Sequence, residues 1–135
     1  MSGLFTQLIQ GNIPCHKIHE DERFFSFLDI RPMKEGHVLV IPKQEIDYIF
    51  DLDNALLGDL FNFAKPIAKA MQAAIDCKRV GIMVAGLEVP HAHVHLVPIS
   101  AVSDLAFANS KDADPKDLAI TATKIKQALA SELQN

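Results

Sequence analysis

One segment of alternating histidines and apolar residues constrains the fold of this chain most strongly: His91-Ala92-His93-Val94-His95-Leu96-Val97-Pro98. Successive side chains of a β-strand point to opposite faces of a sheet, so a period of two predicts a strand with all three imidazoles on one face. The other face carries Ala92, Val94 and Leu96 and suits a hydrophobic core. We therefore expect a strand over His91–Pro98 that buries its apolar face and turns its imidazole face outward.

Four further segments have the composition of strands: Cys15–His19, Phe24–Asp29, His37–Pro42 and Val80–Ala85. Turn signals separate the first three, with acidic residues at 20–22 and an Arg-Pro pair followed by Gly36. Short turns of this kind favour hairpins. We expect His16 and His19 to be solvent-facing strand residues without a role in the chemistry.

Three segments have helical periodicity. The apolar residues of segment 4–9 recur at helical spacing until Gly11-Asn12 and Pro14 stop the pattern. From about Asp53 to Asp76, apolar residues step by three or four and form a broad face, and Pro66 predicts a kink there. Asp114 as N-cap and Pro115 at the first helical position predict a last helix over about 115–133.

Strands in hairpins with one long helix between them predict an α+β fold. We expect a mainly antiparallel five-stranded sheet with one long central helix and a C-terminal helix. The absence of internal repeats from 135 residues predicts a single domain over 1–135, in which 105–135 form a C-terminal extension.

Charge and composition exclude several classes of protein. Thirteen Lys and Arg against 17 Asp and Glu give a net charge of −4, which argues against a nucleic-acid partner but not against a single bound nucleotide. Two cysteines are too few for a disulfide framework, which favours a reducing compartment. No apolar run reaches the roughly 18 residues of a membrane span, and no basic residue precedes Lys17 as a signal peptide would require. We expect a cytoplasmic protein without membrane contacts.

Three imidazoles on one face can support two kinds of chemistry. Neutral histidine is the commonest zinc ligand, and three of them can leave an open catalytic position, with Glu88 close enough in sequence to activate water. Alternatively, one imidazole attacks an electrophile while its neighbours position it or donate protons. Residue counting leaves both possibilities open.

The segment from His91 to Val97 matches the pattern His-φ-His-φ-His-φ-φ, with φ apolar, throughout. In this the sequence resembles the histidine-triad (HIT) family of nucleotide hydrolases and transferases. Three more blocks resemble the family in the same order, so that the resemblance covers nearly the whole chain: residues 5–14, residues 27–43 with Phe27-Leu28-Asp29-Ile30-Arg31-Pro32 at their start, and residues 56–60. The resemblance implies a HIT-like fold.

The resemblance also implies a mechanism and a set of catalytic residues. His93 would attack the α-phosphorus of a nucleotide, expel the leaving group and hold the nucleotidyl group until water removes it. A backbone carbonyl that holds one ring N–H would fix the tautomer in which the other nitrogen attacks. His91 and His95 would bind phosphate oxygens and protonate the leaving group, and His37 would complete the cluster.

The same resemblance implies a nucleoside pocket and no cofactor. Asp29 would accept hydrogen bonds from the two ribose hydroxyls. Without the resemblance, the apolar residues of this set would be plain core and Asp29 a turn residue. The remaining residues of the implied nucleotide site are five around the base and two in the loop before the triad: Leu4, Phe5, Leu8, Phe27 and Ile30, and Gly86 and Glu88.

The sequence also departs from the family pattern. Ala85 and Leu87 stand where many members carry Asn and Gln that reach the phosphates, although the glycine at 86 still allows backbone N–H groups to approach. Gly3 and Thr6 stand at the zinc-binding cysteine positions of some members, so no metal is expected. The chain contains no Trp, so the Trp-containing tail of the phosphoramidase branch is absent.

The resulting hypothesis is a hydrolase or nucleotidyl transferase that acts on a purine nucleoside monophosphate conjugate, of the phosphoramidate or the dinucleoside polyphosphate type. The alternatives are a catalytically weak nucleotide-binding sensor or adaptor, suggested by Leu87, and a metal-dependent hydrolase that uses the triad as ligands. The resemblance also implies a homodimer formed through the long helix and one strand, with which the broad apolar helix face is compatible.

Overall fold

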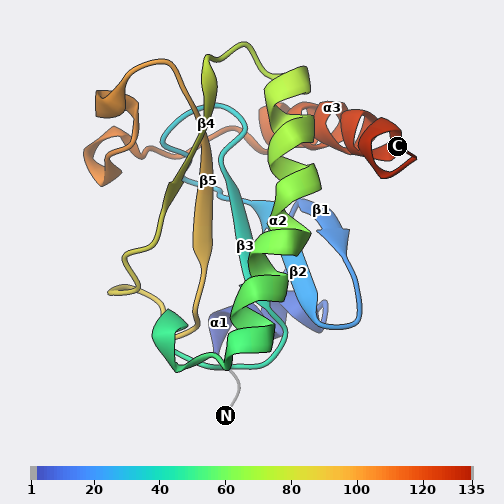
Figure 1. The fold of residues 1–135 in the computed structure, drawn as a ribbon. Helices are drawn as coiled ribbons and strands as arrows, with labels where there is room; N and C mark the ends of the chain where they lie inside the picture. Colours follow the sequence, from blue (N-terminus) through green and yellow to red (C-terminus); the bar gives the residue numbers. More distant parts are fainter. Residues whose placement is uncertain (1–2, 135) are drawn as a thin grey trace.

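Five strands form one antiparallel sheet in the order β1-β2-β3-β5-β4. The structure, a computed structural model, describes residues 3–134. The strand bounds are Lys17–Glu20 for β1, Phe24–Leu28 for β2, Val38–Pro42 for β3, Arg79–Met83 for β4 and Val94–Ile99 for β5. The first three strands form successive hairpins, and β5 lies between β3 and the edge strand β4 (Figure 1). The predicted antiparallel five-stranded sheet is confirmed.

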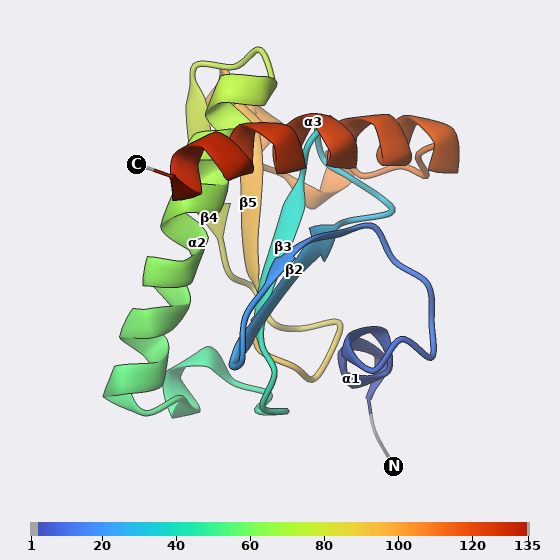
Figure 2. The ribbon, with the colours of Figure 1, turned by 90° about the vertical axis from the view of Figure 1, so that its right-hand side faces the viewer.

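Three α-helices surround the sheet: α1 (Leu4–Ile9), α2 (Asn54–Ala74) and α3 (Pro115–Leu133). Figure 2 shows α2 on one side of the sheet and α1 on the other, with α3 crossing one end. Asp53 caps α2 by accepting the Leu56 N–H at 2.7 Å, and Asp114 caps α3 by accepting the Lys116 N–H at 2.9 Å. The α-helix of α2 continues through Pro66. The predicted central and C-terminal helices are therefore confirmed.

The hydrophobic core has two parts because the central strands are covered on both faces. The larger part fills the space between the sheet, α2 and α3, and includes Val38, Val40, Val94 and Leu96. The smaller part lies between the sheet and α1, and consists of Phe5, Leu8, Phe25, Phe27, Leu39 and Ile41. Alternate residues of β3 thus enter different parts of the core, as the pleat of a strand requires.

The predicted strand over His91–Pro98 is wrong at its beginning, since β5 starts at Val94. The pairing of β3 with β5 continued beyond Val40 and Val94 would place Pro42 opposite Ala92. Proline has no N–H and cannot continue the ladder. The N–H of Ala92 instead donates to the Ile46 carbonyl at 2.7 Å, so the segment before β5 runs beside the chain that follows β3.

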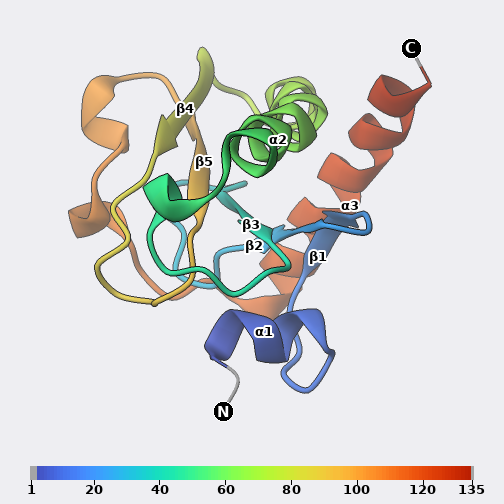
Figure 3. The ribbon, with the colours of Figure 1, turned by 60° about the horizontal axis from the view of Figure 1, so that its bottom comes forward.

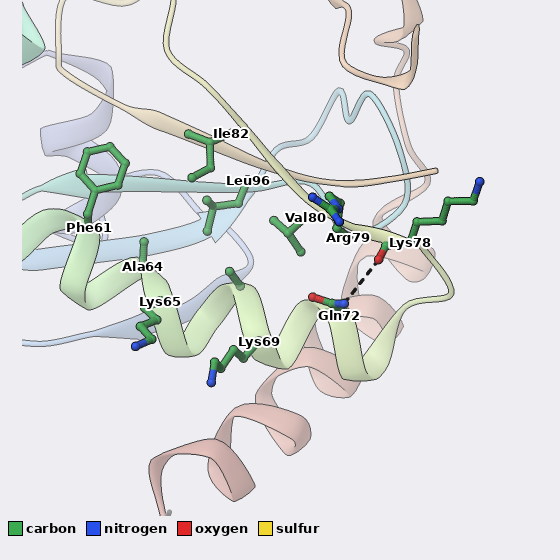
Figure 4. Close-up of a pocket in the computed structure, with 11 residues that line it drawn as sticks. Phe61, Ala64, Lys65, Lys69, Gln72, Lys78, Arg79, Val80, Ile82 and Leu96 are labelled. Carbon is green, nitrogen blue, oxygen red and sulfur yellow. Dashed lines mark hydrogen bonds between the residues drawn. The ribbon is translucent and has the colours of Figure 1, made fainter. Parts of the chain in front are cut away.

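The broad apolar face of α2 serves two surfaces. One stripe, with Leu60, Ile67 and Met71, is buried in the larger core, where α3 also packs. The other stripe, with Phe61 and Ala68, borders a groove between α2 and the edge strand β4, from which Ile82 projects (Figure 4). Packing against α3 therefore explains part of the width of the apolar face of α2. From the sequence alone, this width was related only to a homodimer.

Two smaller findings complete the description of the fold. His19 is half-buried and its ring stacks on Phe63 with centroids 5.4 Å apart, so the expectation that it faces solvent is wrong. Within residues 3–134, no helix has both the length and the apolar character that a membrane crossing requires.

Candidate active site

Four histidines gather on the sheet face that α1 covers. His37 directly precedes β3, His95 lies within β5, and His91 and His93 lie in the segment before β5. All four are between 1% and 6% exposed. Phe5 of α1 covers two of them, since it packs edge-on against the rings of His91 and His93 with centroids 5.6 and 5.2 Å away. The prediction that the imidazole face points outward is therefore wrong, since a second layer buries it.

A chain of hydrogen bonds fixes the proton positions of His37 and His95. The backbone N–H of Met33 donates to His37 Nδ1 at 3.0 Å, so this nitrogen must be the acceptor and the proton of neutral His37 lies on Nε2. His37 Nε2 then donates to His95 Nδ1 at 2.9 Å. The single proton of neutral His95 consequently lies on Nε2, which is buried and has no hydrogen-bond partner. His95 thus presents a free N–H donor.

Backbone carbonyls fix the other two imidazoles. His93 Nδ1 lies 2.6 Å from the carbonyl oxygen of His91, and because a carbonyl can only accept, Nδ1 carries the proton. The lone pair of His93 is therefore on Nε2. By the same argument His91 Nε2 donates to the Pro42 carbonyl at 2.7 Å, which ties this segment to the end of β3 and leaves its Nδ1 buried without a partner.

Burial favours the neutral form of His37, His91 and His95. It lowers the pKa of His37 to about 3 and that of His95 to about 4, with a smaller contribution from the neighbouring imidazole in each case. Burial also lowers the pKa of His91, against the opposing effects of the Pro42 carbonyl and Glu45. The hydrogen-bond directions above, which assume neutral His37 and His95, therefore hold at neutral pH.

A pocket of about 360 Å³ opens beside the histidines, between α1 and the sheet. Its lining includes His93 and His95 and seven of the eight predicted nucleotide-binding residues: Leu4, Phe5, Leu8, Phe27, Asp29, Ile30 and Glu88. Leu4 and Ile30 are 49% and 63% exposed, so two free apolar side chains border this pocket. Mostly apolar walls with a few polar groups are typical of small-molecule sites.

Asp29 lies at the end of β2, where its backbone N–H donates to the His37 carbonyl at 3.0 Å. Its Oδ1 accepts the Arg31 N–H at 2.8 Å, as a turn residue would, and Oδ2 lies 3.7 Å from His37 Nε2. Burial raises the pKa of Asp29, while the Arg31 N–H opposes that rise. The two predictions for Asp29, a turn residue or a ribose ligand, are thus compatible, because the turn uses one carboxylate oxygen and the side chain also lines the pocket.

The eighth predicted nucleotide-binding residue, Gly86, lines an adjacent pocket that also reaches His93. Its φ is +75°, a left-handed conformation that L side chains rarely adopt. A Cβ there would meet nothing within 4 Å, so the backbone conformation and not space requires glycine. The backbone of this loop is therefore open to a bound group.

Several residues that line the pocket beside the histidines escaped sequence reasoning. Phe107, in the 3₁₀ helix η3 (Phe107–Asn109), packs edge-on against His95 with centroids 5.4 Å apart, and Ser110 lines the same pocket. Hydrogen bonds from Asn109 Nδ2 to the carbonyls of Ser103 and Asp104 stabilise this segment. No motif marked these residues, because their position depends on how the chain returns after β5.

The positions implied for zinc-binding cysteines hold a hydrogen-bonded cluster instead. The Gly3 N–H and the Thr6 hydroxyl both donate to Glu45 Oε1, at 2.8 and 2.7 Å. These hydrogen bonds, that from Thr6 first, lower the pKa of Glu45. Glu45 thus anchors the first turn of α1 to the segment that follows β3.

A metal could be held elsewhere in the part of the chain described, by Asp29, His37 and His95, whose ligand atoms lie within 4.8 Å of one another. This set differs from the predicted triad of ligands, since it lacks His91 and His93. Two of its nitrogens are already hydrogen-bonded to each other, so metal binding there would require that bond to break.

Comparisons with known proteins agree with this geometry. Residues 10–102 match the HIT domain family model. The chain is 32% identical to Protein hit of Bacillus subtilis (strain 168), with 95% of this chain and 94% of that protein covered. It is 38% identical to Adenosine 5'-monophosphoramidase HNT1 of Saccharomyces cerevisiae, with 70% of this chain and 61% of that protein covered. A Hit-like protein involved in cell-cycle regulation from Bartonella henselae has a similar crystal structure, with a TM-score of 0.84 at 30% identity over 94% of this chain and 96% of that one. The chain therefore belongs to the HIT domain family of the histidine triad superfamily.

Proposed function

We propose that this protein hydrolyses conjugates of a purine nucleoside monophosphate at the α-phosphorus, through a nucleotidyl-histidine intermediate on His93. One observation carries the proposal: the His91 carbonyl holds the Nδ1 proton of His93 and leaves the lone pair on Nε2, in a ring that lines the pocket. A neutral imidazole with a fixed lone pair is a competent nucleophile near neutral pH. The family's adenosine 5'-monophosphoramidases support the reaction class.

His95 would stabilise the negative charge that develops on the phosphoryl oxygens. Its Nε2 N–H is buried and unpartnered, and a donor that is already oriented needs no reorganisation during the reaction. His37 holds that donor in place and would act as a positioning residue. His91 has its only N–H engaged by Pro42, so its proposed task is to orient His93 through its carbonyl.

The pocket under α1 would bind the nucleoside. Phe5, Phe27 and Ile30 would contact the base, and the oxygen of Asp29 that the turn leaves free would accept a ribose hydroxyl. Glu88 and the backbone beside Gly86 would lie along the phosphate. These apolar walls and a single carboxylate match the few polar anchors that a nucleoside needs.

Turnover of adenosine 5'-phosphoramidate in excess chelator tests this proposal. We expect hydrolysis to AMP, and in a base-quenched reaction a nucleotidyl group on the peptide that spans His91 to His95. In His93→Ala, turnover should be lost while calorimetry shows AMP binding within roughly tenfold of the wild type, because the base and ribose contacts lie elsewhere. His19→Ala, a histidine outside the cluster, is the matched control.

Each alternative makes a different prediction for the same assay. A nucleotide sensor would bind AMP without turnover. A metal-dependent hydrolase would lose its rate in chelator, and His93→Ala would not abolish a reaction centred on Asp29, His37 and His95. Turnover in chelator that depends on His93 excludes both alternatives together.

We further propose a homodimer formed through the groove between α2 and β4. β4 is an edge strand with unpaired backbone groups, and edge strands are templates for pairing with another chain. Phe61 and Ile82 are 38% and 53% exposed beside it (Figure 4). Two copies related by a two-fold axis would bury these residues and extend the sheet.

A further inference from the structure

Residues 100–113, here called the strap, connect β5 to the N-cap of α3. Figure 3 shows this segment leave the sheet after β5, form two short helical turns and return to the start of α3. The turns are the 3₁₀ helices η2 (Val102–Asp104) and η3. The match to the HIT domain ends at residue 102, so the family pattern does not account for most of the strap.

The strap is held in place at both ends. Near its start, Asp104 Oδ2 accepts the N–H groups of Ser100 and Ala101, at 2.8 and 3.1 Å. At its far end, the N–H of Ala113 donates to the carbonyl of Ile30 at 3.1 Å. Ile30 lines the pocket beside the histidines, so this bond ties the strap to a wall of that pocket.

Phe107 is the residue through which the strap contacts the histidine cluster. Two of the rings around His95 belong to His37 and His93, with centroids 5.1 and 5.0 Å away. These two histidines are 1% and 6% exposed, whereas Phe107, with its centroid 5.4 Å from that of His95, is 43% exposed. The ring of Phe107 therefore lies between His95 and solvent. Because it has no polar atom, it can be replaced without breaking the hydrogen-bonded chain of histidines.

The polar group of His95 that benefits from this cover is its Nε2 N–H. Nδ1 is occupied by His37, while Nε2 is buried and has no hydrogen-bond partner. His95 and Phe107 both line the pocket beside the histidines, so a phosphoryl group held there would meet both side chains. A donor that is fixed in a water-excluded site stabilises negative charge far better than the same donor in water. An apolar ring excludes water without competing for the proton.

We propose that Phe107 is a positioning residue that keeps water from the Nε2 N–H of His95 and so reserves this donor for a phosphoryl oxygen of the bound nucleotide. The inference rests on the proposed function for the identity of the ligand. It assigns a role in phosphate recognition to a residue of the strap, outside the triad motif. The strap should accordingly strengthen the binding of the phosphate and not that of the nucleoside.

Calorimetry with AMP and adenosine isolates the phosphate. The wild type should prefer AMP, and Phe107→Ala should reduce this preference roughly tenfold, because a hydrated donor gains less from a charged acceptor than a shielded donor does. Phe107→Leu, which keeps an apolar cover, should retain most of the preference. Val102→Ala, at an 89% exposed position of the same strap, is the matched control and should change neither affinity.

Two outcomes of this titration would overturn the inference. Equal losses for AMP and adenosine in Phe107→Ala would make Phe107 a wall of the pocket without influence on His95. A gain in AMP affinity would show that the ring blocks the donor instead of reserving it.

Proton exchange at His95 tests the shielding directly and needs no turnover. In NMR spectra of isotope-labelled protein, the Nε2 proton of His95 should be visible in the wild type and in Phe107→Leu, and should be lost to rapid exchange with water in Phe107→Ala. Equal exchange in the wild type and Phe107→Ala would overturn the inference, whatever the rate of turnover. If the titrations and the exchange agree with the inference but adenosine 5'-phosphoramidate is not hydrolysed, the proposed function alone fails, and Phe107 keeps its role in nucleotide binding.

Discussion

His37 offers a direct test of the hydrogen-bond chain, because two substitutions separate its shape from its donor. His37→Leu removes both partners of the ring, whereas the side-chain amide of His37→Gln can accept the Met33 N–H and donate to His95 Nδ1. In His37→Leu, the catalytic tautomer of His95 would leave Nδ1 buried without a partner. A buried unsatisfied group costs about 1–3 kcal/mol. Because that cost falls on the state with a free Nε2 N–H, kcat/KM should fall roughly 5- to 150-fold.

Steady-state kinetics with adenosine 5'-phosphoramidate measures this effect, with circular dichroism at the assay temperature to confirm that each variant is folded. We expect the loss to appear mainly in kcat, since the base and ribose contacts do not involve His37, and His37→Gln to recover most of the rate. The reasoning is refuted if His37→Leu retains the wild-type kcat/KM. It is refuted equally if the two folded variants lose the same amount, because donor direction would then play no part.

Three other results are expected. Asp29→Ala should weaken the binding of AMP by roughly 10- to 150-fold, the equivalent of about 1.5–3 kcal/mol for a hydrogen bond to a carboxylate, and should weaken the binding of 2′,3′-dideoxy-AMP far less. If calorimetry finds equal losses of affinity for the two nucleotides, Asp29 is a turn residue only. Unfolded His37 and His95 take up protons near pH 6.5, but the folded residues do so only near about 3 and about 4. The unfolded chain therefore binds more protons than the folded one over this range, so the free energy of unfolding should fall as the pH drops from about 6.5 toward 4. The fall should reach up to roughly 1.4 kcal/mol per pH unit for each histidine. Denaturant midpoints that do not move over this range would contradict the buried neutral pair. If the proposed homodimer forms through β4, Ile82→Lys should convert it to a monomer in light scattering, while Ile120→Lys, at an exposed position of α3, should not; an unchanged mass for Ile82→Lys would remove β4 from the interface.

The sequence predicted elements best where local chemistry decides them. Asp114 and Pro115 fixed the start of α3, and the apolar stripes of α2 fixed its length, because caps and periodicity act within a few residues. The beginning of β5 could not be predicted from its own alternation, since Pro42 in another strand ends the ladder. The pattern showed that the three imidazoles share a face, but the cover over that face comes from Phe5, more than eighty residues away.

The candidate site divides in the same way. Motif positions predicted the histidines and several residues that line the pocket beside them, including Asp29 and Ile30. Phe107 and Ser110 lie beyond the segment that matches the HIT domain, and only the return of the chain after β5 brings them to the pocket. The directions of the hydrogen bonds were also beyond sequence reasoning, because they depend on which backbone groups face each ring.

The roof of the site depends on a contact that the family motif does not contain. A helix of six residues such as α1 is not stable by itself, so α1 needs its tertiary contacts to remain over the histidines. Phe5 and Leu8 supply apolar contacts, and Glu45 supplies two hydrogen bonds at the first turn, from Gly3 and Thr6. Both of these bonds lie on the surface, where each contributes a net gain of about 0.5–1.5 kcal/mol. Phe5 adds contacts with Phe27 and with the rings of His91 and His93, so the side chain that holds α1 on the sheet is also the one that covers these two imidazoles.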